Sequence, residues 1–458
     1  MKEVFCIISV FISMMAAAQP KLPAIHISGN HRYFVTGNEH PFFWLGDTGW
    51  LLFAKCNREE AVQYLENRKQ KGFNVIQVML LHDINFGVNA YGDSALHNKN
   101  IALPNTTHGN NFNHPEEYDF WDHVDYVIDE AAKRGIYMAL VPVWGGNMKH
   151  FDVAQVRAYA TFLANRYKNK SNIIWLNGGD IKGSDGLEKW NVIGNTLRSI
   201  DKNHLITFHP RGRNSSSEWF HKSNWLDFNM FQSGHRTYAQ DTSVNELLHY
   251  GEDNWRYVNK DYQLKPVKPT LDGEPSYEGI PYGLHKADEP YWQDYEVRRY
   301  AYWSVFAGGA GFTYGHNSVM QFYTPGDSGV SFFPKIKWQE ALEAPGAWQM
   351  HYLKDLMLSK PYLERMPAQE IIADNTQDKY NYILATKGNN YAMAYTYTGR
   401  NFKINFSKLG FAPQRLYWFH PVDGKKKEIK NVKPNGIVMF DPPGEPANGN
   451  DWVLLIEK

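Results

Sequence analysis

The sequence predicts an α/β fold, a (β/α)8 TIM barrel followed by a small all-β sandwich domain. Short apolar runs typical of buried strands alternate with amphipathic helical segments from Phe42 to His316, which is the order found in parallel sheets. Eight such runs occur, and eight β/α units close a barrel. From about Met366 the helical spacing stops, and strand-like runs separated by turn residues follow.

The elements of the barrel come in regular order after a hairpin region. From Pro20 to Trp44, apolar runs alternate with the turn pairs Gly29-Asn30 and Gly37-Asn38. The predicted strands are Phe42–Asp47, Phe73–Leu80, Ile136–Val143, Asn172–Leu176, Leu205–Phe208, Leu226–Phe231, Pro269–Asp272 and Gly311–His316. The predicted helices are Asn57–Lys71, Asp119–Lys133, Val153–Tyr167, Leu187–Ile200, Ser243–Asn259 and Tyr291–Val305. A doubly wound open sheet is the competing fold, but no Gly-x-Gly-x-x-Gly follows a strand, which disfavours a nucleotide site.

These patterns divide the chain into a signal peptide at residues 1–18, a barrel domain at 19–365 and a β-sandwich domain at 366–458. Lys2 precedes an apolar run from Val4 to Met15, and three alanines follow before Gln19, as in secretory signals. A buried N-terminal helix is the alternative interpretation. Because the run is too short for a bilayer anchor, we expect an exported protein, secreted or periplasmic, without membrane insertion.

Charge and composition limit the classes of possible binding partner. Lys plus Arg equals Asp plus Glu, 48 each, so nothing directs the protein to nucleic acid or to an anionic membrane. Aromatic residues make up 15% of the chain, with 15 Trp and 28 Tyr, and their flat rings suit the apolar faces of sugars as well as half-wet interfaces. Cys56 is the one cysteine after the predicted signal peptide, so we expect no internal disulfide. The sequence leaves the oligomeric state open.

Polar and aromatic side chains stand where the predicted strands end. In a (β/α)8 barrel these ends meet on the face that carries the chemistry. The candidate site residues are Asp47, Trp50, His82, Trp144, Asn177, Asp180, His209, Arg211, Gln232, His235, Glu274, Tyr314 and His316. The segment from Asp83 to Pro115 is long for a connection, and we expect it to wall one side of this face.

Asp180 and Glu274 are the candidate catalytic pair. Glu274 follows a glycine at a strand tip, and Pro275 prevents the strand or a helix from continuing; a surface acid in a turn is the alternative. Asp180 follows two glycines that let the backbone bend; an N-cap is the alternative. Two strand-end carboxylates suit glycoside hydrolysis, in which one protonates the leaving oxygen and the other attacks or activates water.

The remaining candidates predict substrate binding. Asp47 is expected to hold a hydroxyl group or to cap a turn. Asn177 suits a sugar hydroxyl beside the bond being cut, or a turn. Trp50 and Trp144 suit sugar platforms, or core positions.

The histidines fit hydrogen bonding to a polar substrate better than they fit metal binding. His82, His209, His235 and His316 match no compact ligand spacing, and no His-Glu-x-x-His occurs. A metal gathered from several barrel strands is the alternative. A Ser-His-Asp hydrolase is disfavoured because no Gly-x-Ser-x-Gly elbow occurs. We therefore expect no metal and no organic cofactor.

Five strand-end blocks together resemble the apiosidase-like family of bacterial polysaccharide-degrading enzymes, glycoside hydrolase family 140. They are Phe43–Trp50, Asn177–Asp180, His209–Gly212 with Ser215-Ser216, Gln232–His235 and Asp272–Pro275. The similarity runs from about Pro23 to the end of the chain and includes a collagen-binding-like C-terminal β domain. One departure is from the wider barrel superfamily, whose fourth strand usually ends in Asn-Glu, whereas here Asp180 follows Asn-Gly-Gly.

The resemblance implies a (β/α)8 barrel and a retaining mechanism with Glu274 as nucleophile and Asp180 as acid/base. It also implies an oligosaccharide or polysaccharide substrate, the apiose-linked side chains of rhamnogalacturonan II in pectin. Two alternatives stay open at this point: a glycosidase for another pentose or a furanoside, and a non-catalytic glycan-binding surface protein.

Overall fold

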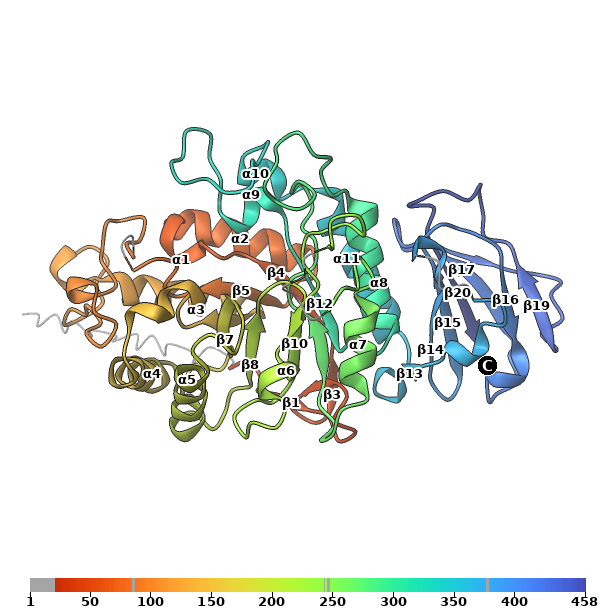
Figure 1. The fold of residues 1–458 in the computed structure, drawn as a ribbon, viewed down its shortest axis with the longest axis horizontal. Helices are drawn as coiled ribbons and strands as arrows, with labels where there is room; N and C mark the ends of the chain where they lie inside the picture. Colours follow the sequence, from red (N-terminus) through yellow and green to blue (C-terminus); the bar gives the residue numbers. More distant parts are fainter. Residues whose placement is uncertain (1–20, 85–86, 243, 245–247, 376–378) are drawn as a thin grey trace, which may run out of the picture.

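The computed structural model describes residues 21–84, 87–242, 244, 248–375 and 379–458, and it confirms the predicted fold class (Figure 1). The predicted signal peptide at residues 1–18 lies outside the described residues. No helix among the described residues is both long and apolar enough to cross a membrane.

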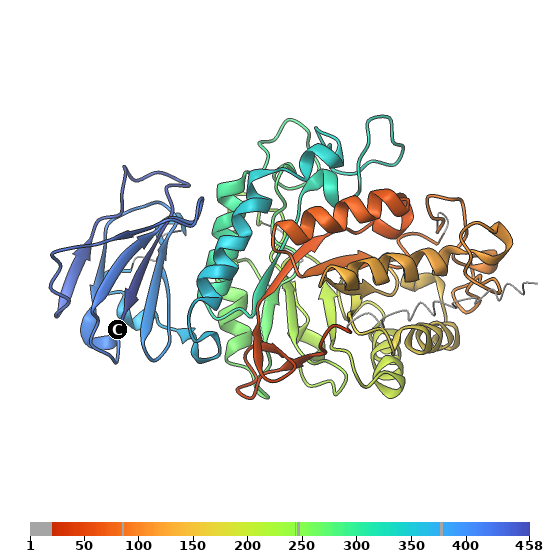
Figure 2. The same cartoon turned by 180° about the vertical axis from the view of Figure 1, so that it is seen from behind.

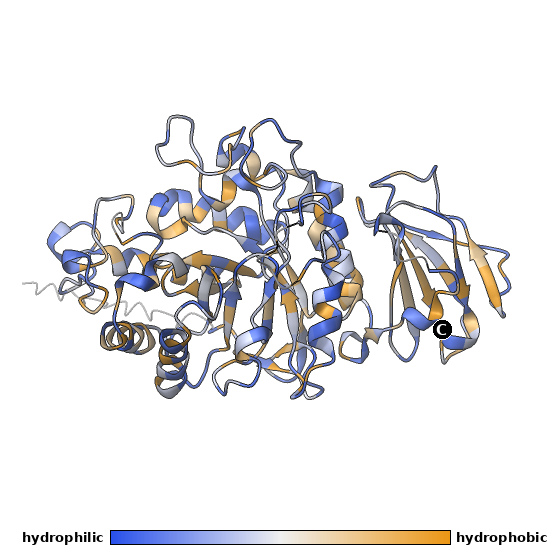
Figure 3. Ribbon diagram, in the orientation of Figure 1, coloured by the Kyte–Doolittle hydropathy of each residue, from blue (hydrophilic) through white to orange (hydrophobic). Residues whose placement is uncertain are grey.

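Eight parallel strands form the barrel. In sheet order they run β8-β7-β6-β5-β4-β12-β11-β10, and the short β9 adds to β10 in the antiparallel sense. Their bounds are β4 Trp44–Thr48, β5 Val75–Met79, β6 Tyr137–Val141, β7 Ile173–Ile181, β8 Ile206–Pro210, β9 Asn214–Ser215, β10 Asn229–Gln232, β11 Thr270–Asp272 and β12 Gly311–Tyr314. Each predicted strand therefore has a counterpart. Hydrophobic residues are frequent along these strands (Figure 3), and most strand residues are buried, which explains why the strands read as continuous apolar runs.

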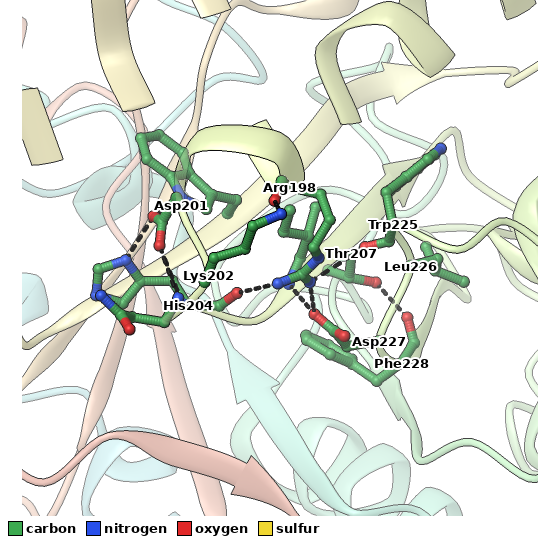
Figure 4. A network of polar contacts seen from close by, with 12 residues as sticks. Arg198, Asp201, Lys202, His204, Thr207, Trp225, Leu226, Asp227 and Phe228 are labelled. Carbon is green, nitrogen blue, oxygen red and sulfur yellow. Dashed lines mark hydrogen bonds and ion pairs between the residues drawn. The ribbon is translucent and has the colours of Figure 1, made fainter. Parts of the chain in front are cut away.

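The barrel closes between β8 and β10 through contacts at the starts of these strands (Figure 4). The amide of Asp227 donates to the carbonyl oxygen of Ile206 at 2.8 Å, and Thr207 Oγ1 donates to the Phe228 carbonyl at 2.6 Å. Asp227 Oδ2 also accepts the Ile206 amide at 2.7 Å and pairs with Arg198. Side chains thus supply part of the bonding at this seam, which has no regular ladder.

Helices surround the strands. Their bounds are α1 Leu52–Lys55, α2 Arg58–Gln70, α3 Phe120–Lys133, α4 Val153–Tyr167, α5 Leu187–Ile200, α6 Ser217–Phe220, α7 Trp255–Tyr262, α8 Asp294–Phe306, α9 Asn317–Met320, α10 Trp338–Ala341 and α11 Pro345–Leu358. The first residues of two predicted helices, Asn57 and Asp119, are the N-caps of α2 and α3 and form capping boxes. The sequence did not predict α11.

The prediction of a helix over Ser243–Asn259 is wrong for most of its described part. Residues 248–254 contain no helix, and α7 begins only at Trp255. Gly251 has a φ of 54°, and a Cβ there would lie 2.4 Å from the ring of Tyr238. The chain turns at this glycine, which helical spacing of the apolar residues cannot reveal. Ser243 and residues 245–247 lie outside the described residues.

The hairpin region forms a three-stranded sheet against the barrel. It consists of β1 Ile25–Ile27, β2 Phe34–Thr36 and β3 His40–Phe42. The Phe34 ring contacts the rings of Trp44 and Phe228 with centroid distances of 6.1 and 5.0 Å. These residues lie at or just before the start of their barrel strands, so the sheet covers the end opposite the carboxyl ends.

The C-terminal β domain consists of two antiparallel sheets. The larger is ordered β13-β14-β15-β20-β17-β18 and the smaller pairs β16 with β19. The bounds are β13 Met366–Pro367, β14 Leu384–Lys387, β15 Tyr391–Thr396, β16 Phe402–Asn405, β17 Arg415–Phe419, β18 Lys426–Glu428, β19 Ile437–Phe440 and β20 Trp452–Glu457. A separate buried cluster, which includes Ala394, Phe402, Phe440 and Leu454, lies between the sheets.

Helices α8 and α11 lie between the barrel and the β domain (Figures 1 and 2). The Tyr302 ring on α8 stacks on Tyr395 of β15 with a centroid distance of 4.7 Å. Arg298 on α8 pairs with Asp451, and both side chains are nearly or fully buried. The barrel and the β domain therefore share one continuous core.

Candidate active site

Strand β7 carries a bulge that turns Asp180 out of the sheet. The ladder with β8 runs to Gly178 and resumes at Ile181, which leaves Gly179 and Asp180 outside it. The φ angles of Gly178, Gly179 and Asp180 are 96°, 101° and 45°. Glycine adopts this left-handed conformation freely, whereas aspartate adopts it at a cost. The bulge redirects one carboxyl group, as bulges beside active sites often do.

The close packing around the bulge also requires glycine at both Gly178 and Gly179. A Cβ at Gly178 would lie 2.6 Å from the carbonyl oxygen of His209, and one at Gly179 would lie 2.7 Å from Cε3 of Trp144. Both distances are shorter than van der Waals contact, so a side chain at either position would displace the bulge. The Asn-Gly-Gly-Asp sequence is therefore what this geometry needs.

The tip of β11 carries Glu274 and is held from several directions. The Gly273 amide donates to the Phe231 carbonyl at 2.8 Å, and Gln77 Nε2 donates to the Gly273 carbonyl at 2.8 Å. Next to it, the buried Asp272 carboxylate accepts Ser233 Oγ at 2.6 Å. These contacts fix the backbone on both sides of the strand tip, so Glu274 projects from a rigid element.

Two histidines face the Glu274 carboxylate. His235 Nε2 lies 3.1 Å from Oε1, and His209 Nε2 lies 3.3 Å from Oε2. His209 Nδ1 accepts the Asp180 amide at 3.5 Å, so in a neutral ring the proton is on Nε2, the ring nitrogen that lies near Glu274. Although burial raises the pKa of Glu274, the hydrogen bonds and charges of His209 and His235 outweigh it and lower the pKa to about 2. Glu274 is therefore ionised.

The pKa of Asp180 is shifted in the opposite direction. Its side chain projects into an open cavity and is exposed there, while protein groups enclose it on the other sides. This enclosure and the negative charge of Glu274 raise the pKa of Asp180 to about 6, against the opposing effects of His209, His235 and Arg211. One carboxyl group thus holds a proton in mildly acidic solution while its neighbour stays charged, which is the arrangement that acid and base roles need.

Both carboxyl groups line one cavity of about 270 Å³. Most of the wall is apolar or aromatic. The lining residues are Trp50, Leu51, Met79, His82, Trp144, Asp180, Gln232, His235, Glu274, Tyr277, Ile280, Leu284, Met320, Gln321, Gly329, Ser331 and Phe332. Trp50 and Trp144 lie side by side with ring centroids 5.4 Å apart. A few convergent polar groups in an apolar cavity are typical of a small-ligand site.

A second compartment of about 210 Å³ adjoins the first. The two share Asp180, Gln232, His235, Leu284 and Phe332. The second compartment differs in charge, because its own lining includes three arginines and a histidine: Arg211, Arg213, Arg236 and His285. Asp180 therefore lies where an apolar chamber meets a cationic one.

The structure brings most of the candidate residues together. Seven line the first chamber: Trp50, His82, Trp144, Asp180, Gln232, His235 and Glu274. Arg211 lines the second. His209 is fully buried behind Trp50 and Glu274, so it faces the carboxylate and not the chamber.

Besides His209, four candidates lie outside both chambers, and for all five the expected contact with substrate is corrected. Asp47 is fully buried, pairs with Arg68 at 2.6 Å and accepts the Tyr64 hydroxyl at 2.7 Å. The Asn177 side chain is also fully buried and donates to the Trp190 carbonyl at 2.8 Å. In both cases the alternating directions of side chains along a strand point the residue between the barrel and its helices.

Tyr314 and His316 are the other two corrected candidates. The Tyr314 hydroxyl donates to the buried carboxyl group of Glu278 at 2.6 Å. His316 caps helix α9 by accepting the Ser318 amide at 3.1 Å, and burial lowers its pKa to about 3. The histidine is therefore a neutral structural group.

Sequence reasoning missed part of the wall. Tyr277 is buried beside Glu274, and burial together with that charge raises the pKa of its hydroxyl well above the usual value. Its place three residues after a strand-tip carboxylate could have identified it. Leu284 and Phe332 belong to long loops that no pattern singled out. None of the described residues of segment 83–115, the expected wall, lines either chamber.

Comparison with known proteins identifies the family of each domain. The family model "Apiosidase-like, catalytic domain" matches residues 28–364, and "Putative collagen-binding domain of a collagenase" matches residues 366–457. A solved structure titled glycoside hydrolase is 45% identical, covers 95% of this chain and 97% of its own, and has a TM-score of 0.89. No curated protein matches the sequence.

Two further solved structures show how far the likeness extends. A glycoside hydrolase family 5 structure from Bacteroides vulgatus ATCC 8482 is 42% identical, covers 95% of this chain and 94% of its own, and has a TM-score of 0.89. An endo-beta-1,4-mannanase from Thermotoga petrophila is 13% identical, covers 91% of each chain with a TM-score of 0.50, and shares the fold alone. Because the apiosidase-like model spans well over half of the sequence and both similar structures are glycoside hydrolases, this chain belongs to the apiosidase-like family and is a glycoside hydrolase.

Proposed function

We propose that the protein is an exported retaining glycosidase of plant cell-wall pectin that acts on the apiose-linked side chains of rhamnogalacturonan II. The observation that carries the mechanism is the pair Asp180 and Glu274, which share one chamber and have pKa values displaced in opposite directions. The signal-like pattern of residues 1–18 supports export.

In this mechanism Glu274 attacks the anomeric carbon while Asp180 gives its proton to the leaving oxygen. The anomeric C–O bond breaks, and a glycosyl ester forms on Glu274. Asp180, now ionised, takes a proton from water, which attacks the ester and releases the sugar with its original anomeric configuration. His209 and His235 keep Glu274 ionised in the free enzyme, and the separation of the carboxyl groups should be about 5 to 5.5 Å.

The two chambers support a pectic substrate. The first chamber has a volume of about 270 Å³. At about 30 Å³ per water, this equals the volume of roughly nine water molecules, which is enough for roughly one sugar ring. Trp50 and Trp144 line this chamber, and aromatic rings suit the apolar faces of sugars. The second chamber is lined by Arg211, Arg236 and Arg213, the last of which also pairs with Asp241, and arginine suits the carboxylates of the uronic acids in pectin.

Sugar release from rhamnogalacturonan II oligosaccharides tests the substrate. We expect the full-length protein to release apiose-terminated chains, and Glu274→Gln and Asp180→Asn to lose this activity. Asp185→Asn is the matched control, because Asp185 is an exposed carboxylate on the same loop. Cleavage of a different pectic or hemicellulosic glycan, with the same loss in both variants, would keep the catalytic pair and reject the substrate.

Azide rescue with an activated aryl glycoside tests the two roles separately. Asp180→Ala plus azide should give a glycosyl azide of retained configuration, because the ester on Glu274 still forms. Glu274→Ala plus azide should give the inverted product, because azide then attacks directly. Proton NMR of the products distinguishes the two, and the reverse assignment of configurations would exchange the proposed roles.

A further inference from the structure

Residues 235–238 connect the active site to the C-terminal β domain within four positions. At one end His235 Nε2 lies 3.1 Å from Glu274 Oε1. At the other end the Tyr238 amide donates to Glu252 Oε1 at 3.2 Å. The Tyr238 ring lies 5.5 Å from the ring of Tyr380, which belongs to the β domain. One short segment therefore contacts both the catalytic carboxylate and the second domain.

Glu252 joins residues 235–238 to the β domain. Its carboxylate is buried, with 1% of its surface exposed. Oε1 accepts both the Tyr380 hydroxyl, at 2.8 Å, and the Tyr238 amide, while Oε2 pairs with Arg299. A buried carboxylate needs all its partners, so loss of the Tyr380 hydroxyl would leave this oxygen underbonded and free to change position.

Residues of the β domain also help to bury the ion pair between Glu252 and Arg299. The fully buried guanidinium of Arg299 lies within 5.2 Å of four ring centroids. Tyr300 and Trp303 come from α8, and Tyr380 and Tyr397 come from the β domain. Because these rings exclude water, the charge-assisted contacts of Glu252 are stronger than they would be at a surface.

We propose that the C-terminal β domain is a positioning element of the active site: the Tyr380 hydroxyl, through Glu252, holds Tyr238 so that His235 stays against Glu274. The inference rests on the proposed role of Glu274. The main chain at His235 has separate anchors, since its carbonyl oxygen accepts the Gly283 amide at 2.8 Å. The Glu252 contact fixes the other end of the segment, at Tyr238. Because both ends are then held, the His235 side chain stays against Glu274.

The expected consequence is a change in the ionisation of Glu274. The groups facing its carboxylate are His209 from β8, His235 from the β10 loop, Asp180 from β7 and the Tyr277 hydroxyl. Asp180 opposes ionisation of Glu274, and the histidines favour it. If His235 moves away, one of the two histidines that lower the pKa of Glu274 against burial is lost, so this pKa rises. The acid limb of kcat/KM then moves to higher pH.

The test compares Tyr380→Phe with Tyr382→Phe in the full-length protein. Tyr382 lies at the same interface and stacks on Trp255 with a centroid distance of 4.4 Å. Its hydroxyl oxygen accepts a hydrogen bond from Gln369 Nε2. On rhamnogalacturonan II oligosaccharides, or another glycan that the wild type cleaves, Tyr380→Phe should lower kcat/KM about tenfold and raise the pH of the acid limb. Tyr382→Phe should leave both unchanged.

Histidine-selective ¹⁵N NMR supplies a readout that needs no substrate. Tyr380→Phe should shift the imidazole resonances of His235, and Tyr382→Phe should not. Wild-type resonances and a wild-type pH profile in Tyr380→Phe, even with a lower unfolding temperature, would overturn the positioning role and leave the contact purely structural. Full activity of Glu274→Ala would instead reject the proposed catalytic mechanism, a result that the NMR comparison does not depend on.

Discussion

Replacing Gly179 by alanine tests whether the β7 bulge places Asp180. Gly179 has a φ of 101°, and a Cβ there would lie 2.7 Å from Trp144 Cε3 and 3.1 Å from Val141 Cγ1. The indole cannot move away freely, because Trp144 lies against Trp50 and near His209. The added methyl group should therefore displace the bulge and not the ring.

Two costs can be worked out from this geometry. A left-handed backbone at a residue with a Cβ costs about 1 to 2 kcal/mol, so the free energy of unfolding should fall by roughly 2 kcal/mol once crowding against Trp144 is included. The next residue in the chain is Asp180, and misplacement of a catalytic group by about 1 Å costs on the order of a hundredfold in rate. The effect on activity should therefore far exceed the effect on folding.

Gly146→Ala is the matched control. Gly146 lies two residues after Trp144, and nothing is within 4 Å of a Cβ built there. The assay is kcat/KM on an oligosaccharide that the wild type cleaves, together with urea unfolding. Gly179→Ala should lose about a hundredfold in kcat/KM while staying folded, and Gly146→Ala should match the wild type. Equal behaviour of the two variants would refute the assignment of the bulge as the element that positions Asp180.

Three further predictions concern charge. First, kcat/KM should fall as the pH rises through about 6, because Asp180 must be protonated to act as the acid; a profile that stays flat from pH 5 to 8 would contradict this. Second, a folded-state pKa raised above that of the unfolded chain means that deprotonation of Asp180 costs stability as the pH rises through that window, so Asp180→Asn should raise the thermal unfolding midpoint at pH 8 more than at pH 4. Third, Asp451→Asn should lower the free energy of unfolding by about 3 kcal/mol in denaturant titrations, because it removes the fully buried carboxylate of the two that pair with the buried Arg298 and leaves only the partly exposed Asp294; a loss below about 1 kcal/mol, the range of surface pairs, would show that this contact does not act as a buried ion pair.

Local patterns predicted much of the fold correctly. Helices α4 and α5 have the bounds that apolar spacing and flanking residues predicted. Patterns failed where a single tight contact decides the chain direction, as at Gly251 against Tyr238. They also failed for α11, whose apolar residues pack against both the barrel and α8, so no single stripe marks it.

The sequence alone determined the strand order, the carboxylates at the tips of β7 and β11, and the glycines that allow the bend before Asp180, because each depends on residues adjacent in the chain. Only the tertiary structure decided which strand-end side chains reach the chamber. Asp47, Asn177, Tyr314 and His316 look equivalent to their neighbours in the sequence, yet the barrel points them into its packing. The separation of the two pKa values likewise arises from groups distant in sequence, since His209 and His235 meet Glu274 only when three strands lie side by side.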